Sequence, residues 1–284
     1  MNKRKLIYII INFIVLVIAL FLLSKNFNIT ELINYKEISI IFICSVLFVH
    51  AIKALRLYIA LYETEISKME YLKIFCKVTP INIILPFKLG ELFRIYCYGY
   101  IIKDWPKSTV IILLDRFMDT MALLTILALV LLKDGELTLF VYMLILFSLF
   151  VFLLYKNFPN LYTYWKKYFL TSKADSEKIK ALKYMEILNN IYKEIAKIIQ
   201  GRGIILYILS IFAWFIEIIN FLWLIKINSF EKINNNISEY LFAALNLGQS
   251  KELSQFIVIS IVILLTIYII IKITELFNRK EVCK

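Results

Sequence analysis

The sequence has very few of the residues that usually bind metal ions. Its 284 residues include a single histidine, His50, and four cysteines, none of which form a Cys-x-x-Cys pair. Zinc and haem sites draw their ligands from clustered cysteines and histidines. We therefore expect no metal centre and no cofactor. We interpret His50 as a helix-packing residue, with a proton relay as the alternative.

Charged residues, glycine and proline are also scarce. Only 19% of the residues are charged, six are glycine and four are proline, whereas 61% are hydrophobic. The mean hydropathy is +0.78. A soluble domain of this length could not bury so much apolar side chain. The composition predicts an all-α polytopic membrane protein, with residues 1–284 forming one transmembrane domain in the cell membrane.

The net charge of +12 does not indicate a nucleic-acid-binding protein. Proteins that bind nucleic acid gather their lysines and arginines on one face or in one domain. Here these residues flank the apolar stretches instead. We expect no nucleic-acid partner, and we interpret the basic residues as determinants of membrane orientation.

Six apolar stretches are long enough to cross the roughly 30 Å hydrocarbon core of a bilayer as helices. Two further stretches, residues 78–102 and 237–248, are too broken or too short for ordinary spans, and we interpret them as re-entrant or interfacial segments. The six predicted spans are residues 6–23, 39–61, 109–132, 137–155, 204–225 and 253–271.

The distribution of basic residues predicts the orientation, because cytoplasmic loops carry the excess of lysine and arginine. With the N-terminus in the cytoplasm, 26 of the 33 lysines and arginines fall in cytoplasmic segments and 6 in outer segments. We therefore predict that both termini are cytoplasmic. Residues 156–202 then form a basic cytoplasmic loop, and its aromatic-rich start indicates an amphipathic helix on anionic lipids.

The first broken stretch contains two prolines, Pro80 and Pro86, followed by Gly90. Each proline removes a backbone donor and disfavours helix in the residue before it. We predict a helical hairpin that enters from the cytoplasmic side, with its break between Pro86 and Gly90. Glu91 and Arg94 lie on one face of its second helix. They form either an ion pair that stabilises the hairpin or a contact to a lipid headgroup.

The third predicted span carries three charges, Asp115, Arg116 and Asp119. Asp115 and Asp119 share a helix face, and counted along the helix Asp119 lies about 15 Å deep. Two acids and one base leave a surplus negative charge for Arg94, another cation or a proton. Charge at membrane depth is unfavourable, so we interpret this set as functional.

Charged residues also occur in three other apolar stretches. Lys53 and Arg56 lie one turn apart near the inner end of the second span, and we interpret them as snorkelling to the headgroups, with a phosphate contact as the alternative. Glu217 follows Trp214 by three residues in the fifth span and has no cation on its own helix. Glu239 opens the second broken stretch.

These motifs resemble one known family. The pattern Asn-x-x-Leu-Pro-x-x-x-Gly-Glu-x-x-Arg over residues 82–94, followed about twenty residues later by Asp-Arg-x-x-Asp, resembles the transmembrane family of lysylphosphatidylglycerol synthase, also called the flippase-like family. The Trp-x-x-Glu pair is also similar. Asp115 departs from the family, which usually has glutamate there, and the proline and glycines expected before Glu239 are absent.

The resemblance implies a translocase for lipids or lipid-linked glycans. Its partners would be anionic phospholipids or polyprenyl-linked glycans. The alternative is a non-transporting membrane partner of a lipid-modifying or glycan-assembly enzyme. We expect no enzymatic activity, because no Ser-His-Asp set or P-loop is present and the family's synthase carries its chemistry in a separate soluble domain. The predicted substrate-path residues are Pro86, Gly90, Glu91, Arg94, Asp115, Arg116, Asp119, Glu217 and Glu239.

Overall fold

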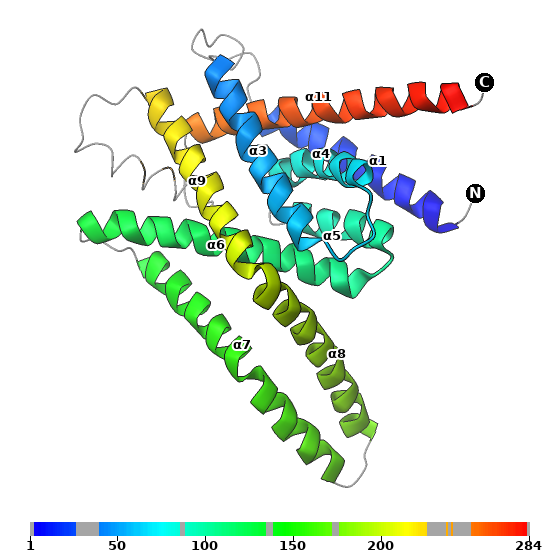
Figure 1. Ribbon diagram of the computed structural model, residues 1–284, viewed down its shortest axis with the longest axis vertical. Coiled ribbons are helices and arrows are strands. Elements are labelled where there is room, and N and C mark those ends of the chain that lie inside the picture. The colour runs from blue at the N-terminus through cyan, green and yellow to red at the C-terminus, as the bar shows by residue number, and fades with distance from the viewer. Residues whose placement is uncertain are drawn as a thin grey trace.

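The computed structural model describes residues 3–26, 40–85, 89–134, 139–171, 176–225, 237, 240 and 251–282. All regular structure in these residues is helical (Figure 1). This agrees with the predicted all-α class. Five helical stretches are long and apolar enough to cross a membrane: Lys5–Ser24, Ile40–Ala60, Tyr142–Thr171, Ser176–Trp223 and Leu253–Glu275.

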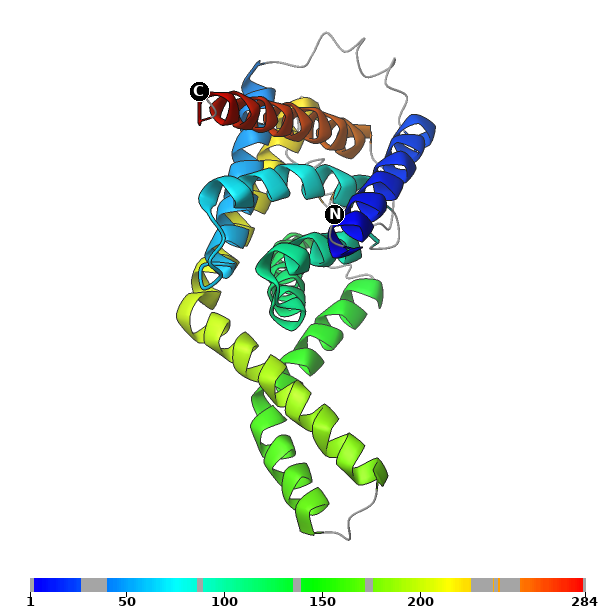
Figure 2. The same cartoon turned by 90° about the vertical axis from the view of Figure 1, so that its right-hand side faces the viewer.

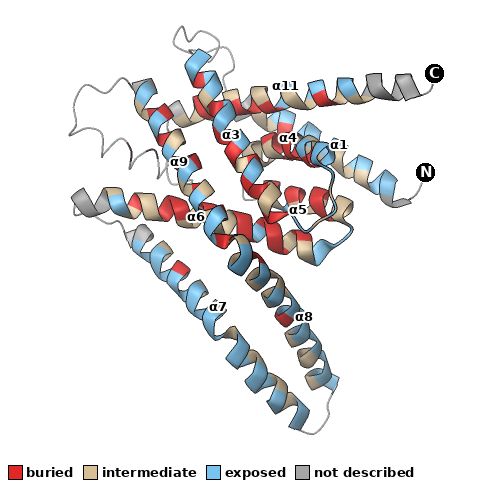
Figure 3. Cartoon of the chain, viewed as in Figure 1, coloured by how far each residue is buried: buried red, intermediate tan, exposed pale blue. Residues whose placement is uncertain are grey.

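The centre of the molecule is formed by two helices, α3 (Ile40–Ala60) and α9 (Ile204–Ile225), which lie side by side (Figure 1). Phe42, Val46 and Val49 of α3 repeat at helical spacing, and each is at most 1% exposed. This spacing gives one apolar stripe that faces the neighbouring helices. In Figure 3 the buried residues concentrate on α3 to α6 and on α9.

Two long helices, α6 (Trp105–Asp134) and α11 (Lys251–Val282), run across α3 and α9 in Figure 1. The start of α6 is stabilised by Asp104, whose carboxylate accepts a hydrogen bond of 3.0 Å from the backbone N–H of Lys107. Because α6 crosses α3, depth counted along α6 does not measure depth along α3. The predicted depth of 15 Å for Asp119 was counted along α6, so it does not give the position of Asp119 relative to the charged residues of α3.

The predicted helical break is confirmed, since α4 (Lys68–Ile84) and α5 (Leu89–Ile102) are separate helices that pack against each other. Leu85 ends α4 in an extended conformation, with φ −74° and ψ 127°. This is the conformation favoured before a proline, and Pro86 comes next, although it lies outside the described residues. The other proline of this stretch, Pro80, lies inside α4, which continues through it.

Helices α7 (Leu139–Thr171) and α8 (Ser176–Ile198) form a hairpin that extends away from the rest of the molecule (Figures 1 and 2). Residues 156–171 and 176–202 of the predicted basic cytoplasmic loop are helical, and their location in the cytoplasm remains a prediction. Helix α7 passes through Pro159, and α8 joins α9 through the π-helical turn η1 (Ile199–Gly203). The charged residues of this region favour helix, so its polarity does not end the helices.

The N-terminal helix α1 (Lys3–Asn26) packs against α4 and is otherwise largely uncovered. Phe13 is 67% exposed and Phe21 is 65% exposed. Of the second broken stretch, only Ile237 and Tyr240 are described, and both are buried. The rest of that stretch lies outside the described residues, so the prediction of a re-entrant segment there remains a prediction.

Candidate functional site

Arg56 of α3 joins three helices in the buried interior. The residue is 3% exposed. Its Nε donates a hydrogen bond of 2.7 Å to Asp115 Oδ1, and its Nη1 donates to Asp119 Oδ1. The same Nη1 donates a hydrogen bond of 2.8 Å to the Ser210 hydroxyl of α9. Asp115 and Asp119 can share one guanidinium because they lie one turn apart on α6.

Arg94 of α5 reaches the same acid from the other side. Its Nη2 donates a hydrogen bond of 2.9 Å to Asp115 Oδ2, so each carboxylate oxygen of Asp115 binds a different arginine. The surplus negative charge predicted on α6 is thus neutralised by two arginines. Arg94 contacts Asp115 and not Asp119, whose partner is Arg56.

Glu91 ties the first turn of α5 to α4 and α6. Asn82 of α4 donates a hydrogen bond of 2.9 Å to Glu91 Oε1, and Arg116 of α6 forms an ion pair with the same oxygen. The pair between Glu91 and Arg94 within α5 is longer, at 3.6 Å. Glu91 therefore does more than stabilise its own helix, because its two closest partners lie on other helices.

Gly90 permits the close contact between α4 and α5. A Cβ atom at this position would collide with both the side chain and the backbone of Asn82. The close approach of α5 to α4 therefore requires a residue without a side chain. It also brings Asn82 within hydrogen-bond distance of Glu91, the next residue along α5.

A second ion pair lies one turn along α3, between Lys53 and Glu217. Lys53 Nζ is 2.9 Å from Glu217 Oε2 and 5.3 Å from the centre of the Trp214 ring. Glu217 Oε1 accepts a hydrogen bond of 3.0 Å from the Tyr240 hydroxyl. Three residues of helix advance about 4.5 Å, so this pair lies close to the Arg56 site along α3.

The interpretation of Lys53 and Arg56 as snorkelling residues was wrong. The Lys53 side chain is 22% exposed and that of Arg56 is 3% exposed, and both charges point to carboxylates on other helices. Their spacing could have predicted a shared role, since cations three residues apart lie on the same face of a helix. That face also carries apolar residues. Sequence alone does not show whether that face meets lipid or α6 and α9.

The whole charged set is balanced, and we call it the ion network. Six of its members are linked through shared ion pairs, and the Lys53–Glu217 pair lies beside them. Counting the described ion pairs, four cations meet four carboxylates. A buried charge is tolerated only when it is paired in this way. A charged ligand would therefore have to replace an internal partner. The members of the network are Lys53, Arg56, Glu91, Arg94, Asp115, Arg116, Asp119 and Glu217.

Several buried polar atoms beside the ion network have no hydrogen-bond partner among the described residues. They are the Tyr98 hydroxyl, Trp214 Nε1, Asn220 Nδ2 and both ring nitrogens of His50. The His50 ring instead stacks on Phe256 at 6.1 Å, which agrees with a packing role. Buried donors without partners are unfavourable.

The predicted site residues are thus largely brought together. Gly90 packs directly beside the network, and the six charged residues predicted on α5, α6 and α9 all belong to it. Pro86 and Glu239 lie outside the described residues. Sequence reasoning named Lys53 and Arg56 only as snorkelling residues or phosphate contacts, and it missed Ser210. Among the described residues, no three histidine, cysteine, aspartate or glutamate side chains gather as they would around a metal ion.

A second polar cluster joins η1 to the end of α3. Arg202 donates hydrogen bonds of 2.8 Å to the Ile59 carbonyl and 2.6 Å to Glu63 Oε1, and Lys197 lies 2.7 Å from Glu63 Oε2. The hydrogen bond from Lys197 lowers the pKa of Glu63, with Arg202 adding to the effect. This exposed cluster fixes the bend between α8 and α9.

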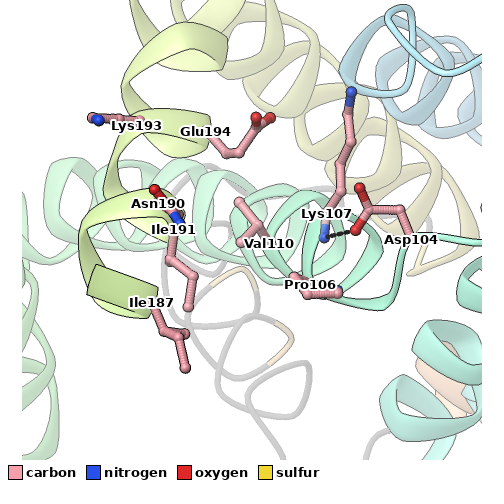
Figure 4. Close-up of a pocket in the computed structure, with 9 residues that line it drawn as sticks. All are labelled: Asp104, Pro106, Lys107, Val110, Ile187, Asn190, Ile191, Lys193 and Glu194. Carbon is pink, nitrogen blue, oxygen red and sulfur yellow. Dashed lines mark hydrogen bonds between the residues drawn. The ribbon is translucent and has the colours of Figure 1, made fainter. Parts of the chain in front are cut away.

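A cavity of about 400 Å³ lies between the start of α6 and α8 (Figure 4). Its lining mixes both signs of charge with apolar side chains, and none of its residues belongs to the network. We therefore do not assign the predicted lipid site to it. It is lined by Asp104, Pro106, Lys107, Val110, Ile187, Asn190, Ile191, Lys193 and Glu194.

Comparison of the chain with protein-family models, curated proteins and solved structures gave no match. The resemblance to the flippase-like family therefore stays a prediction based on the motifs over residues 82–119.

Proposed function

We propose that this protein is a multi-pass protein of the cell membrane that binds the polar headgroup of an anionic lipid or lipid-linked glycan and moves it between leaflets. The observation that carries the proposal is the ion network buried between α3, α5, α6 and α9. Ionisable side chains within membrane segments are rare and usually line a substrate or ion path. The resemblance of the motifs to the flippase-like family is what supports lipid as the substrate class in this proposal.

The balanced charge of the network fits a closed resting state. Each carboxylate already holds a cation, so an entering phosphate would compete with Asp115, Asp119 or Glu217 for their partners. Arginine is well suited to this exchange, because its planar guanidinium binds carboxylate and phosphate in similar geometry. Unpaired donors such as Trp214 Nε1 would contribute further hydrogen bonds.

We further propose six membrane crossings with both termini in the cytoplasm. The sixth crossing would be helix α6. It is not among the five candidate spans, because Asp115, Arg116 and Asp119 make it less apolar than they are. Asp115 and Asp119 face other helices and are largely enclosed by protein, and the 39% exposed Arg116 is paired with Glu91 of α5. Without this crossing, the basic residues of 156–202 would lie outside, against the usual distribution.

A non-transporting role beside a lipid-modifying enzyme is the second candidate. The observation that favours it is the α7–α8 hairpin, since α7 has no buried residue in its most apolar window. A 33-residue helix is about 50 Å long, well over the roughly 30 Å of the hydrocarbon core. The excess length would present α8 and the end of α7 to a cytoplasmic partner.

Transport can be tested with purified protein in liposomes that contain a trace of fluorescent phosphatidylglycerol. Dithionite bleaches only the outer leaflet, so a translocase exposes more than half of the dye. We expect this in the wild type and not in the charge-neutral double variant Arg94→Gln/Asp115→Asn. This variant removes one positive and one negative charge, and it leaves Arg56 paired with Asp119 and Arg116 paired with Glu91.

The control is Glu186→Gln on the exposed face of α8, which should transport as the wild type does. Bleaching that stops at half for the wild type, with phosphatidylglycerol and with a polyprenyl phosphate, would contradict translocation. Full activity in a folded Arg94→Gln/Asp115→Asn variant would exclude the ion network as the path.

A further inference from the structure

Lys77 of α4 carries a charge that the ion network does not neutralise. It lies on the side of the hairpin that faces α1, where its Nζ donates hydrogen bonds to Asn12 Oδ1 and, at 3.4 Å, to the Tyr8 hydroxyl. Both partners are neutral. Lys77 forms no ion pair with any carboxylate in the described part of the chain.

The contrast with the neighbouring lysine is informative. Lys73, one turn earlier on α4, contacts both oxygens of Glu275 at 2.7 Å, so its charge is compensated by α11. Lys77 is partly buried and has no such partner. A cation held away from water by neutral groups is unfavourable unless an anion joins it.

Aromatic rings enclose the ammonium group. Lys77 Nζ is 5.0 Å from the centre of the Tyr8 ring and 6.0 Å from that of Phe93. The Tyr8 ring stacks on Tyr100 at 4.0 Å, and the thiol of Cys97 lies 3.9 Å from Asn12 Oδ1. An ammonium has three N–H groups, so the two hydrogen bonds of Lys77 leave one for a further acceptor.

The surroundings indicate where such an acceptor would come from. The helices that meet at Lys77 also carry uncovered apolar side chains, including Phe13 of α1 at 67% exposure and Leu92 of α5 at 63%. Acyl chains can lie along these surfaces while a headgroup meets Lys77. A soluble anion would gain nothing from them.

We propose that Lys77, Asn12 and Tyr8 form a binding site for the phosphate of an anionic phospholipid, separate from the ion network. The bound lipid would compensate the charge of Lys77 and fasten α1 to the hairpin of α4 and α5. The site does not depend on translocation, so either proposal can fail without the other.

The test uses the full chain in detergent with phosphatidylglycerol or phosphatidylcholine, and it measures bound lipid by native mass spectrometry together with the thermal midpoint. We expect the wild type to retain phosphatidylglycerol selectively and to be stabilised by it. Lys77→Met removes one charge-assisted hydrogen bond to the phosphate and should weaken this binding about tenfold. Lys77→Arg should retain it, and Lys73→Met serves as the matched control.

Three outcomes decide the matter. Equal binding of phosphatidylglycerol to the wild type and Lys77→Met overturns the site, as does an equal loss in Lys73→Met. If Lys77→Met does not fold, competition between the two lipids for the wild type still tests the proposal. Binding without preference for phosphatidylglycerol over phosphatidylcholine overturns the site. Displacement of the lipid by millimolar inorganic phosphate supports a site for the phosphate group itself, and absence of displacement supports one that requires the whole lipid.

Discussion

Arg56 is the residue on which the candidate site depends most. One guanidinium contacts Asp115, Asp119 and Ser210 and so holds α3, α6 and α9 together. Its near-complete burial means that water cannot replace these contacts when one partner is removed. The same argument applies to Asp115, which receives two arginines, and it explains why the network is sensitive to single charge changes.

We expect Arg56→Met to lower the free energy of unfolding by roughly 3–5 kcal/mol, because Asp119 is left as a buried charge without its closest partner. The single change Asp119→Asn should likewise be destabilising. The double variant should recover part of the loss, with a coupling energy of about 0.5–3 kcal/mol. The measurement is unfolding of the purified variants in mixed detergent micelles.

The matched control for this cycle is the ion pair between Lys166 and Glu186 on the α7–α8 hairpin, whose atoms are 3.7 Å apart and whose side chains are 44% and 49% exposed. Its double-variant cycle should show no coupling beyond the error of the measurement. Strict additivity for Arg56 and Asp119 would mean that the two charges do not meet.

Among the elements, the hairpin of α4 and α5 is the most constrained. Its helices approach so closely at Gly90 that an added Cβ would lie 2.7 Å from the carbonyl oxygen of Asn82. Rotation of a side chain cannot relieve a collision with the backbone. The helices would have to separate, which would also lengthen the hydrogen bond between Asn82 and Glu91.

We therefore expect Gly90→Ala to destabilise the protein by roughly 1–3 kcal/mol, as overpacking does elsewhere. Gly201→Ala is the control, because nothing lies within 4 Å of the Cβ that it adds. Thermal unfolding of the two variants in the same detergent tests the difference. Equal midpoints would show that the hairpin helices can move apart without loss.

At the scale of the whole molecule, the number of membrane crossings depends on α6. Five other helical stretches are apolar enough to cross, and an odd number of crossings would place the two termini on opposite sides. Six crossings keep the C-terminus and the α7–α8 connection in the cytoplasm, in agreement with their basic residues. The two topologies thus differ at positions that can be labelled.

We expect Ser24→Cys to react with an impermeant maleimide from outside, whereas Glu177→Cys and the native Cys283 should react only after permeabilisation. Each is examined alone, with the other cysteines replaced, including the exposed Cys44. Reaction of both Glu177→Cys and Cys283 from outside would mean that α6 does not cross the membrane.

The sequence determined the elements of this protein. Runs of apolar residues predicted helices at α1, α3, α6, α9 and α11, since a long apolar run has few other stable structures. Proline chemistry predicted a helical break beginning at Pro86, and α4 ends at Ile84 with Leu85 as its C-cap. The acids of α6 were recognised as functional candidates because carboxylates in an apolar helix need partners.

Tertiary structure decided which charges are partners. Lys53 and Arg56 look like residues that reach for the headgroups, and only the crossing of α6 and α9 over α3 shows that they meet Asp119 and Glu217 instead. Likewise, Lys73 and Lys77 are alike in sequence, but packing against α11 gives one of them Glu275. Helical periodicity fixes which residues share a face, whereas the helix that covers that face depends on contacts between residues far apart in the chain.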